Sequence, residues 1–468
     1  MEQNGSFALR KPALDMGKDS INKLLLNMSL PATLAMAVMA SYNIVDTFFV
    51  SRLGSQAIAA LSVCFPIQML LNAAAVGTGI GGASLISRYL GAQKDEEAAT
   101  AVGQVILLSL VLGLVVTLIG LFALRPLLLM FGATEAILEQ TAEYMSVIVY
   151  GAALIFLMMV LNHAVRSEGN AILPMTVMII SAVANIILDP IFIFTFGMGI
   201  RGAAIATVLA KIIGAWLLLR YYVTRKSTLK VLFKHLLPNW GIILDIYRVG
   251  LPSMFIQVSL NLAVILVNRL LGGFGHIPIA VMGLMMRFQL FAFMPVVGIS
   301  QGLLPIIGFN FGAAKYQRMR EAMVKGTLIG TILATLTALV LFIFPGFFLR
   351  LFSSEEALLA MGIYAVRVMV LMYPLHAMQI NSISFFQAIG KGVTSLVLSM
   401  LRQFILYVPS AYLLTHFFAL KGTWFAIPLA DLLAFLVTIV ILSREFNRRG
   451  IPLFGHKEYK PETSEVLN

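Results

Sequence analysis

The sequence predicts an all-α membrane protein of about twelve transmembrane helices, arranged in two six-helix bundles that are related by internal duplication. Three observations support this fold class. The chain has 468 residues, of which 60% are hydrophobic and 12% are charged, whereas soluble domains have roughly 25% charged residues. Long apolar segments recur along nearly the whole chain, and residues of the first half recur in the second half at a fixed offset.

Each apolar segment is long enough to cross a hydrocarbon core of roughly 30 Å as a helix. In chain order we place the segments near 25–50, 57–84, 101–124, 142–163, 172–196, 200–222, 250–272, 277–304, 322–347, 361–388, 393–417 and 420–443. The strands of a transmembrane β-barrel would alternate in polarity over about ten residues, and these segments do not. Residues 1–23 are polar, so we expect no cleavable signal peptide.

The internal repeat has an offset of 221 residues: Leu30-Pro31 recurs as Leu251-Pro252, and Gly91-Ala92 recurs as Gly312-Ala313. The same offset relates Gly77 to Gly298, Gly81 to Gly302, Phe131 to Phe352, Glu135 to Glu356 and Gly169 to Gly390. Near the end the offset becomes 220, which relates Arg201-Gly202 to Lys421-Gly422. Six spans per copy return the chain to the same side of the membrane, so the two copies have the same orientation.

The repeat defines the domain organisation. We expect an N-terminal tail (1–24), an N-terminal bundle (25–222), a linker (223–249), a C-terminal bundle (250–443) and a C-terminal tail (444–468). On this assignment, 23 lysines and arginines lie on the side of both tails and the linker, against 5 on the opposite side. The positive-inside rule then makes both termini cytoplasmic. We expect a multi-pass protein of a prokaryotic plasma membrane, and a monomer.

The net charge of +12 is therefore explained by topology and does not indicate a nucleic-acid partner. The single cysteine, Cys64, excludes an intrachain disulfide and CxxC-type redox or metal motifs. We interpret Cys64 as a packing residue, and we expect no organic cofactor.

Two aspartates, Asp46 and Asp189, lie deep inside apolar segments of the first half. A carboxylate at membrane depth costs roughly 2.5–3.5 kcal/mol, which makes it a candidate functional group. Tyr42 and Asn185 each lie four residues before one of these aspartates and so share its helix face. Thr207 adds a hydroxyl in the next span.

If these faces converge, they provide only oxygen ligands and hydrogen-bond partners. Such ligands suit a hard monovalent cation or a proton rather than zinc or copper. We therefore predict a possible Na⁺ site at Asp46, Asn185, Asp189 and Thr207, with Tyr42 assisting. Two adjacent carboxylates in a low dielectric do not both ionise without a compensating cation, which is the physical basis of an ion-coupled exchanger. The structural alternative is that the aspartates cap a broken helix or pair with Lys211.

Two prolines are predicted to bend helices near this site. Pro190 cannot donate to the carbonyl of Ile186 and is expected to bend its helix. Pro31 could similarly permit the first span to bend. Irregular backbone at membrane depth is tolerated where it lines an enclosed cavity.

The second half lacks both aspartates, because their repeat positions hold Val267 and Ser410. Its polar residues within spans are mostly basic: Gln257, Asn261, Arg269, Arg287, Arg367, Arg402 and Asp431. Methionine and phenylalanine cluster at 281–295, a composition that suits an adaptable binding surface. We predict that Gln257, Asn261, Arg287, Met286 and Phe288 line a substrate cavity.

The sequence resembles the multidrug and toxic compound extrusion (MATE) transporter family over about residues 24–445. The resemblance is carried by IVDTFFVSRLGSQAIAALSVCFPIQ, by GTGIGGASLISRYLGAQ with its repeat GISQGLLPIIGFNFGAAK, and by NHAVRSEGNAILPMTVMIISAVANIILDPIFIF. It implies two six-helix bundles and export of cationic or amphipathic small molecules against Na⁺ or H⁺.

The chain looks most like the branch whose cation site is in the N-terminal bundle. That site's motif falls on Tyr42, Asp46, Asn185, Asp189 and Thr207, and Pro31 matches a proline at which the first helix is thought to bend. Another branch has acidic residues in the seventh and tenth helices, where this chain has Gln257 and no carboxylate between Met361 and Ile389.

Three other functions are alternatives to an antiporter. A flippase for lipid-linked precursors of the same superfamily would prefer a basic cavity, which the second half could supply and the acidic first half opposes. A membrane-embedded enzyme would need a catalytic constellation such as paired histidine and carboxylate motifs, and the sequence contains none. A channel is distinguished from an antiporter by the direction of flux relative to the gradient.

Overall fold

The computed structural model describes residues 14–453, except the side chains of Leu260 and Asn261. Parts of both predicted tails, residues 1–13 and 454–468, lie outside the described residues. The described chain is almost entirely helical, as the fold class requires.

The N-terminal bundle contains seven α-helices and one π-helical segment. In chain order these are α1 (Ile21–Ser51), α2 (Ser55–Gly91), α3 (Asp95–Met130), α4 (Glu135–Tyr150), α5 (Ala152–Ser167), α6 (Ile172–Pro190), η1 (Ile191–Thr195) and α7 (Gly199–Val223). The linker that follows contains one short 3₁₀-helix, η2 (Phe233–Leu236).

The C-terminal bundle repeats this pattern. Its elements are α8 (Trp240–Gly272), α9 (His276–Gly312), α10 (Tyr316–Ile343), α11 (Pro345–Arg350), α12 (Glu356–Val370), α13 (Tyr373–Ala388), α14 (Gly392–Met400), η3 (Leu401–Tyr407) and α15 (Val408–Asn447). α11 was not predicted; it begins at Pro345, whose fixed φ suits the first position of a new helix.

Nine segments among the described residues are long and apolar enough to cross a membrane, or eleven when each of two bent helix pairs counts as one span. The longest, Gly392–Asn447, has 56 residues and is interrupted at Ala419 (φ 50°, ψ −143°). Dividing it there gives the twelve predicted spans, and the predicted fold class is confirmed.

Two spans are bent in a way that the sequence analysis did not predict. α4 meets α5 at an angle of 55°, and α12 meets α13 at an angle of 53°. The breaks fall at Gly151 and at Met372, which the repeat places at equivalent positions. Several helices also extend past the predicted ends; α2 continues to Gly91 and α9 to Gly312. Apolar length reports the membrane-embedded part of a helix and does not show where its polar end stops.

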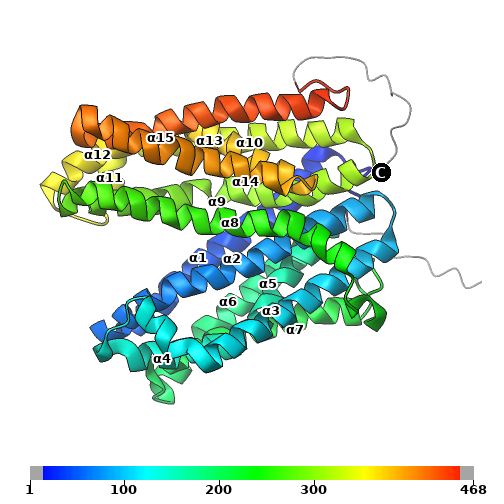
Figure 1. The fold of residues 1–468 in the computed structure, drawn as a ribbon, viewed down its shortest axis with the longest axis horizontal. Coiled ribbons are helices and arrows are strands. Elements are labelled where there is room, and N and C mark those ends of the chain that lie inside the picture. Colours follow the sequence, from blue (N-terminus) through cyan, green and yellow to red (C-terminus); the bar gives the residue numbers. More distant parts are fainter. Residues whose placement is uncertain (1–13, 454–468) are drawn as a thin grey trace, which may run out of the picture.

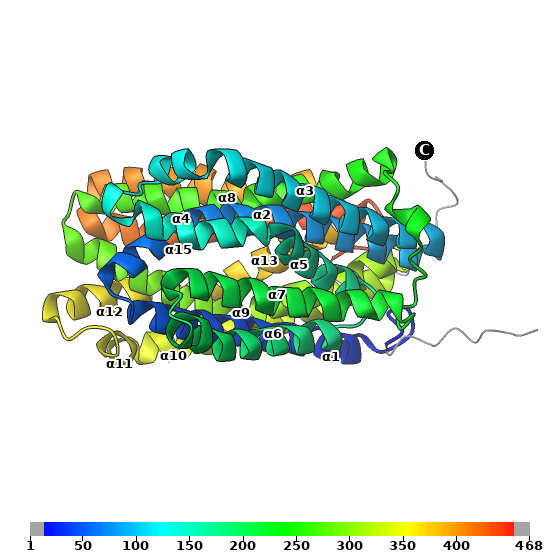
Figure 2. The same cartoon turned by 90° about the horizontal axis from the view of Figure 1, so that it is seen from below.

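The two bundles converge at the end of the molecule where the linker and the described parts of both tails lie, and they diverge towards the opposite end (Figure 1). α1 packs against α9 of the other bundle, and α2 packs against α8. The repeat relates these two pairs. Seen from below, α1 and α9 lie along one face of the molecule, and α2 and α8 along the other (Figure 2).

Glycines permit the closest approach of the two bundles. A Cβ added at Gly91 of α2 would overlap the carbonyl oxygen of Phe309 on α9, and a Cβ added at Gly312 of α9 would overlap that of Arg88 on α2. Gly91 and Gly312 are repeat partners, so the contact has the pseudo-symmetry of the sequence. Small residues allow helix backbones to meet closely, which is the main source of helix association inside a membrane.

One buried apolar cluster also connects the bundles at this end. It joins Leu24 and Met28 of α1 to Leu303 and Ile307 of α9. The other clusters lie mainly within one bundle. A second cluster joins Ile242 and Ile246 of α8 to the N-terminal bundle, so the two bundles are separate packing units with apolar contacts at both α1–α9 and α2–α8.

We predict that Gly312→Ala opens the contact between the bundles at the end where they converge. The added methyl group cannot be accommodated without a backbone shift, and such overpacking costs about 1–3 kcal/mol. Thiol labelling of a cysteine introduced at the fully buried Ser87, in a Cys64→Ala background, should become faster. The matched control is Gly283→Ala on the same helix, where an added Cβ meets nothing within 4 Å; equal labelling of the two variants would contradict the prediction.

Candidate cation site

The candidate site is formed by α1, α6 and α7 of the N-terminal bundle. Asp46 lies in the last two turns of α1, and Asp189 is the last residue of α6 before Pro190. α6 ends at this proline, and the chain continues without a break as the π-helix η1. π-helical turns are rare and frequent at functional sites. Pro31 lies inside α1, which is assigned as one continuous helix.

Asn185 connects the polar groups of α6 and α7. Its Nδ2 donates to Asp189 Oδ1 at 3.2 Å and lies 3.4 Å from Thr207 Oγ1. Asp189 is fully buried, and Asn185 is only 2% exposed. The carboxyl groups of Asp46 and Asp189 lie close enough together for their charges to interact. The structure thus brings together Asp46, Asn185, Asp189 and Thr207, as the sequence analysis required of a cation site.

Three oxygen atoms of this group are buried and accept no hydrogen bond from the described residues. They are Oδ1 of Asp46, Oδ2 of Asp189 and Oδ1 of Asn185. Buried polar atoms without a partner are uncommon and call for an explanation. A hard monovalent cation is bound by such oxygens, and a proton could be shared between the two carboxyl groups. The residues present therefore fit the predicted ion.

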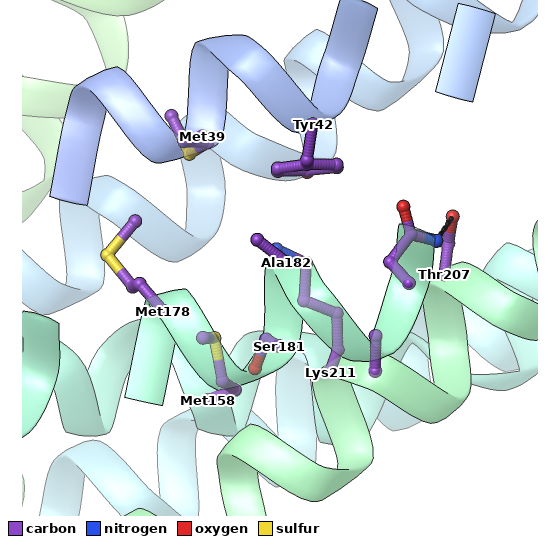
Figure 3. A pocket seen from close by; sticks show the side chains of 10 residues that line it. Met39, Tyr42, Met158, Met178, Ser181, Ala182, Thr207 and Lys211 are labelled. Atoms are coloured by element: carbon purple, nitrogen blue, oxygen red, sulfur yellow. Dashed lines mark hydrogen bonds between the residues drawn. The ribbon is translucent and has the colours of Figure 1, made fainter. Parts of the chain in front are cut away.

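A small cavity adjoins the site. It has a volume of about 20 Å³ and is lined by Met39, Tyr42, Met158, Met178, Ser181, Ala182, Asn185, Thr207, Ala210 and Lys211. This is space for roughly one water molecule. Figure 3 shows Tyr42 on α1 facing the side chains of α6 and α7 across the cavity.

Lys211 does not neutralise the aspartates. Its Nζ lies 5.3 Å from the centroid of the Tyr42 ring, and among the described residues it forms no ion pair with Asp46 or Asp189. The alternative in which Lys211 pairs with an aspartate is thus not the arrangement observed. The cation–π contact fixes Tyr42 on the cavity side of α1.

The sequence analysis missed a second polar pair close to Asp46. Gln68 of α2 donates to the hydroxyl of Tyr144 on α4 at 3.2 Å, and Tyr144 is close enough to Asp46 for their charges to interact. Gln68 is a polar residue inside an apolar segment, and this position alone could have marked it as a candidate functional residue. Tyr144 carries no such signal because tyrosine is common in apolar helices.

The predicted substrate-lining residues of the second half do not form one group. Met286 lines a cavity in the C-terminal bundle. Phe288 packs in the core of that bundle, with ring centroids 6.3 Å from Phe348 and 6.0 Å from Phe352. Arg287 is exposed and Gln257 is half-buried. The side chain of Asn261 lies outside the described residues.

A further buried carboxylate, Glu168, lies just after α5 at the end where the bundles converge. Its Oε2 accepts hydrogen bonds from Tyr221 at 3.2 Å and from Ser227 at 2.6 Å, and its Oε1 has no described partner. Burial raises the pKa of the Glu168 carboxyl to about 7. The sequence analysis did not single out this residue because its polar neighbours come from the linker and from α7.

Comparison with known proteins agrees with this architecture. The sequence model of the MatE family matches residues 31–191 and 252–413, one match in each bundle. The chain belongs to the MatE family. Membership explains the repeat, because the two matched segments correspond to the two copies of the six-span unit.

Proteins similar to this MatE chain align over most of its length. The FAD transporter of Shewanella oneidensis is 28% identical over 88% of this chain and 92% of its own. The multidrug export protein MepA of Staphylococcus saprophyticus is 26% identical over 91% of this chain and 94% of its own.

Among solved structures, the outward-facing conformation of a multidrug resistance MATE family transporter superposes with a TM-score of 0.88. It is 28% identical in sequence and covers 92% of this chain and 97% of its own.

We predict that Glu168 makes the stability of the protein depend on pH. Its folded pKa of about 7 lies above the unfolded value of about 4.3, so the folded state retains a proton that the unfolded chain releases. The contribution of Glu168 is complete below about pH 4 and is lost as the pH rises through about 7. The melting temperature in detergent should therefore fall over this range, and Glu168→Gln should flatten the fall. If the melting temperature fell equally with pH in the wild type and in Glu168→Gln, Glu168 would be excluded as the source of the pH dependence. The control is Glu143→Gln, because Glu143 is exposed.

Proposed function

We propose that this MatE-family chain is a secondary antiporter that exports cationic or amphipathic small molecules in exchange for Na⁺ or H⁺. The observation that carries the proposal is that three buried oxygens without a hydrogen-bond partner belong to neighbouring side chains, those of Asp46, Asn185 and Asp189. The similarity to MepA, a multidrug export protein, supports the class of substrate.

The proposed mechanism depends on the two partners of α1. This helix carries Asp46 and packs against α6, which carries Asp189, and it also packs against α9 of the other bundle. An ion or proton between the carboxyl groups removes their repulsion and favours the arrangement in which α1 and α6 stay close. A cationic substrate that needs the same carboxylates binds best when the ion is absent. Ion entry and substrate exit are thereby coupled through competition and through the position of α1.

The proposed setting is a prokaryotic plasma membrane with both termini in the cytoplasm. The basic linker and the positive-inside rule support this orientation. It makes the end where the bundles converge cytoplasmic, so the described arrangement is closed on that side. We further propose that the protein acts as a monomer, without enzymatic activity and without a nucleic-acid partner.

The deciding experiment measures efflux of a cationic dye in proteoliposomes, with Na⁺ and pH gradients imposed separately. We predict that Asp46→Asn and Asp189→Asn each reduce gradient-driven transport at least about tenfold, because each removes a carboxylate of the ion site. The control is Asp245→Asn, which alters a carboxylate paired with Arg248 on α8. The gradient that drives wild-type transport identifies the ion.

Full transport by both aspartate variants would contradict the site. Absence of transport of every cationic dye under either gradient, together with movement of lipid-linked sugars, would favour the flippase instead.

A second prediction concerns Asn185, which orients the carboxylate of Asp189. Replacing Asn185 by leucine removes the hydrogen bond to Asp189 and one oxygen donor, and the loss of such a group typically weakens ion binding 10–100-fold. The half-saturating concentration of the driving ion should rise by about that factor, while the protein remains folded. Asn43→Leu is the matched control because Asn43 is exposed on α1. An unchanged ion dependence in Asn185→Leu would remove Asn185 from the site.

A further inference from the structure

The C-terminal bundle contains a second and larger cavity, with a volume of about 170 Å³. It lies between α8, α9, α12, η3 and α15. The repeat relates it to the small cavity beside the cation site: Tyr42, Ser181, Thr207 and Lys211 correspond to Ala263, Arg402, Ile427 and Asp431. The two cavities thus occupy equivalent places in the two bundles and differ in their chemistry.

The charges of the C-terminal cavity cancel within the protein. Arg402 Nε donates to Asp431 Oδ1 at 2.5 Å, and the Asp431 side chain is 2% exposed. Three other ionisable groups lie beside them: His376, whose Nδ1 lies 3.7 Å from the same oxygen, and the phenols of Tyr373 and Tyr407. A lone cation would meet a carboxylate that is already paired, and a lone anion would meet a guanidinium that is already compensated. Either ion would bring an unbalanced charge into a low-dielectric site.

Two residues of the cavity lining have polar atoms for which the described residues provide no hydrogen-bond partner. Gln403 is 7% exposed, and its Oε1 is buried without a hydrogen-bond partner. Arg402 is bonded through Nε, and among the described residues no atom accepts from its two Nη groups. These residues are adjacent on the π-helix η3. The cavity lining therefore places the positively charged guanidinium of Arg402, a hydrogen-bond donor, next to the amide oxygen of Gln403, a hydrogen-bond acceptor.

Most of the remaining wall is apolar and adaptable, and Gln289 and Tyr407 add an amide and a phenol to it. Met282, Met285, Met286 and Met369 contribute four thioether side chains. Methionine is flexible and polarisable and packs well against aromatic rings. Such a wall suits a flat apolar body and does not require one fixed shape.

We propose that this cavity is a second ligand site that takes zwitterionic amphipathic molecules, with the negative group on Arg402 Nη, the positive group beside Gln403 Oε1 and the apolar body among the methionines. The site is distinct from the cation site and needs no ion coupling. The proposal rests on the proposed function only in regarding the ligand as an exported substrate.

The test is equilibrium binding to the purified full-length protein, measured by fluorescence anisotropy in halide-free buffer. The probes are two methoxyquinolinium dyes with the same ring system: the inner salt that carries a sulfopropyl group, and the N-ethyl cation. We expect the inner salt to bind and to lose at least about tenfold in affinity in Gln403→Met, which removes the amide oxygen. Met286→Trp should weaken binding at least as much by filling the cavity.

Matched controls separate these effects from unfolding. Gln56→Met and Met130→Trp make the same changes at exposed positions outside the cavity. Each variant is compared only if its melting temperature equals that of the wild type. Neither cavity variant replaces Arg402 or Asp431, so neither leaves a buried charge without its partner.

Three outcomes would overturn the proposal. The inner salt does not bind at millimolar concentration, or it binds with equal affinity to the wild type and both cavity variants, or the cavity variants lose affinity for the inner salt and for the N-ethyl cation to the same extent. Binding is also measured in Asp46→Asn/Asp189→Asn. Retention of inner-salt binding there supports the second site even if the antiport proposal fails, and its loss assigns the ligand to the N-terminal bundle and overturns the proposal.

Discussion

The contact between the two bundles is the constraint on which the rest of this structure depends. Backbones meet at Gly91 and Gly312 because neither residue has a side chain, and the apolar residues of α1 and α9 complete the contact. In a membrane, where lipid is as apolar as the protein surface, such close packing replaces the hydrophobic effect as the source of association. It holds α1 in place, and α1 carries the first carboxylate of the proposed cation site.

This position of α1 gives one helix two roles. Within its own bundle it packs against α6, so that Asp46 reaches Asp189. Across the interface it packs against α9. Local electrostatics at the carboxyl pair and the global arrangement of the bundles are consequently properties of the same helix. In the proposed mechanism, a change of charge on one carboxylate acts on the bundle interface through α1 itself.

The duplication supplied two equivalent cavities, and substitution made them chemically different. The first bundle has two carboxylates, an amide and a hydroxyl, with free oxygens. The second has valine and serine at the aspartate positions and a compensated Arg402–Asp431 pair. A shared fold therefore does not imply a shared ligand, because each pocket is defined by a few side chains.

The sequence by itself determined the fold class, the twelve spans and the duplication, because apolar length and the fixed offset are local or periodic signals. Helical spacing also predicted four residues of the candidate site, which the structure brings together. It could not place the helix breaks near Gly151 and Met372, which depend on packing against neighbouring helices. It could not find Tyr144 or Glu168, whose partners come from distant segments. It identified Arg402 and Asp431 without showing that they pair, since 29 residues separate them. Only the tertiary structure decided which charges are compensated and which oxygens remain free, because both depend on distances between helices.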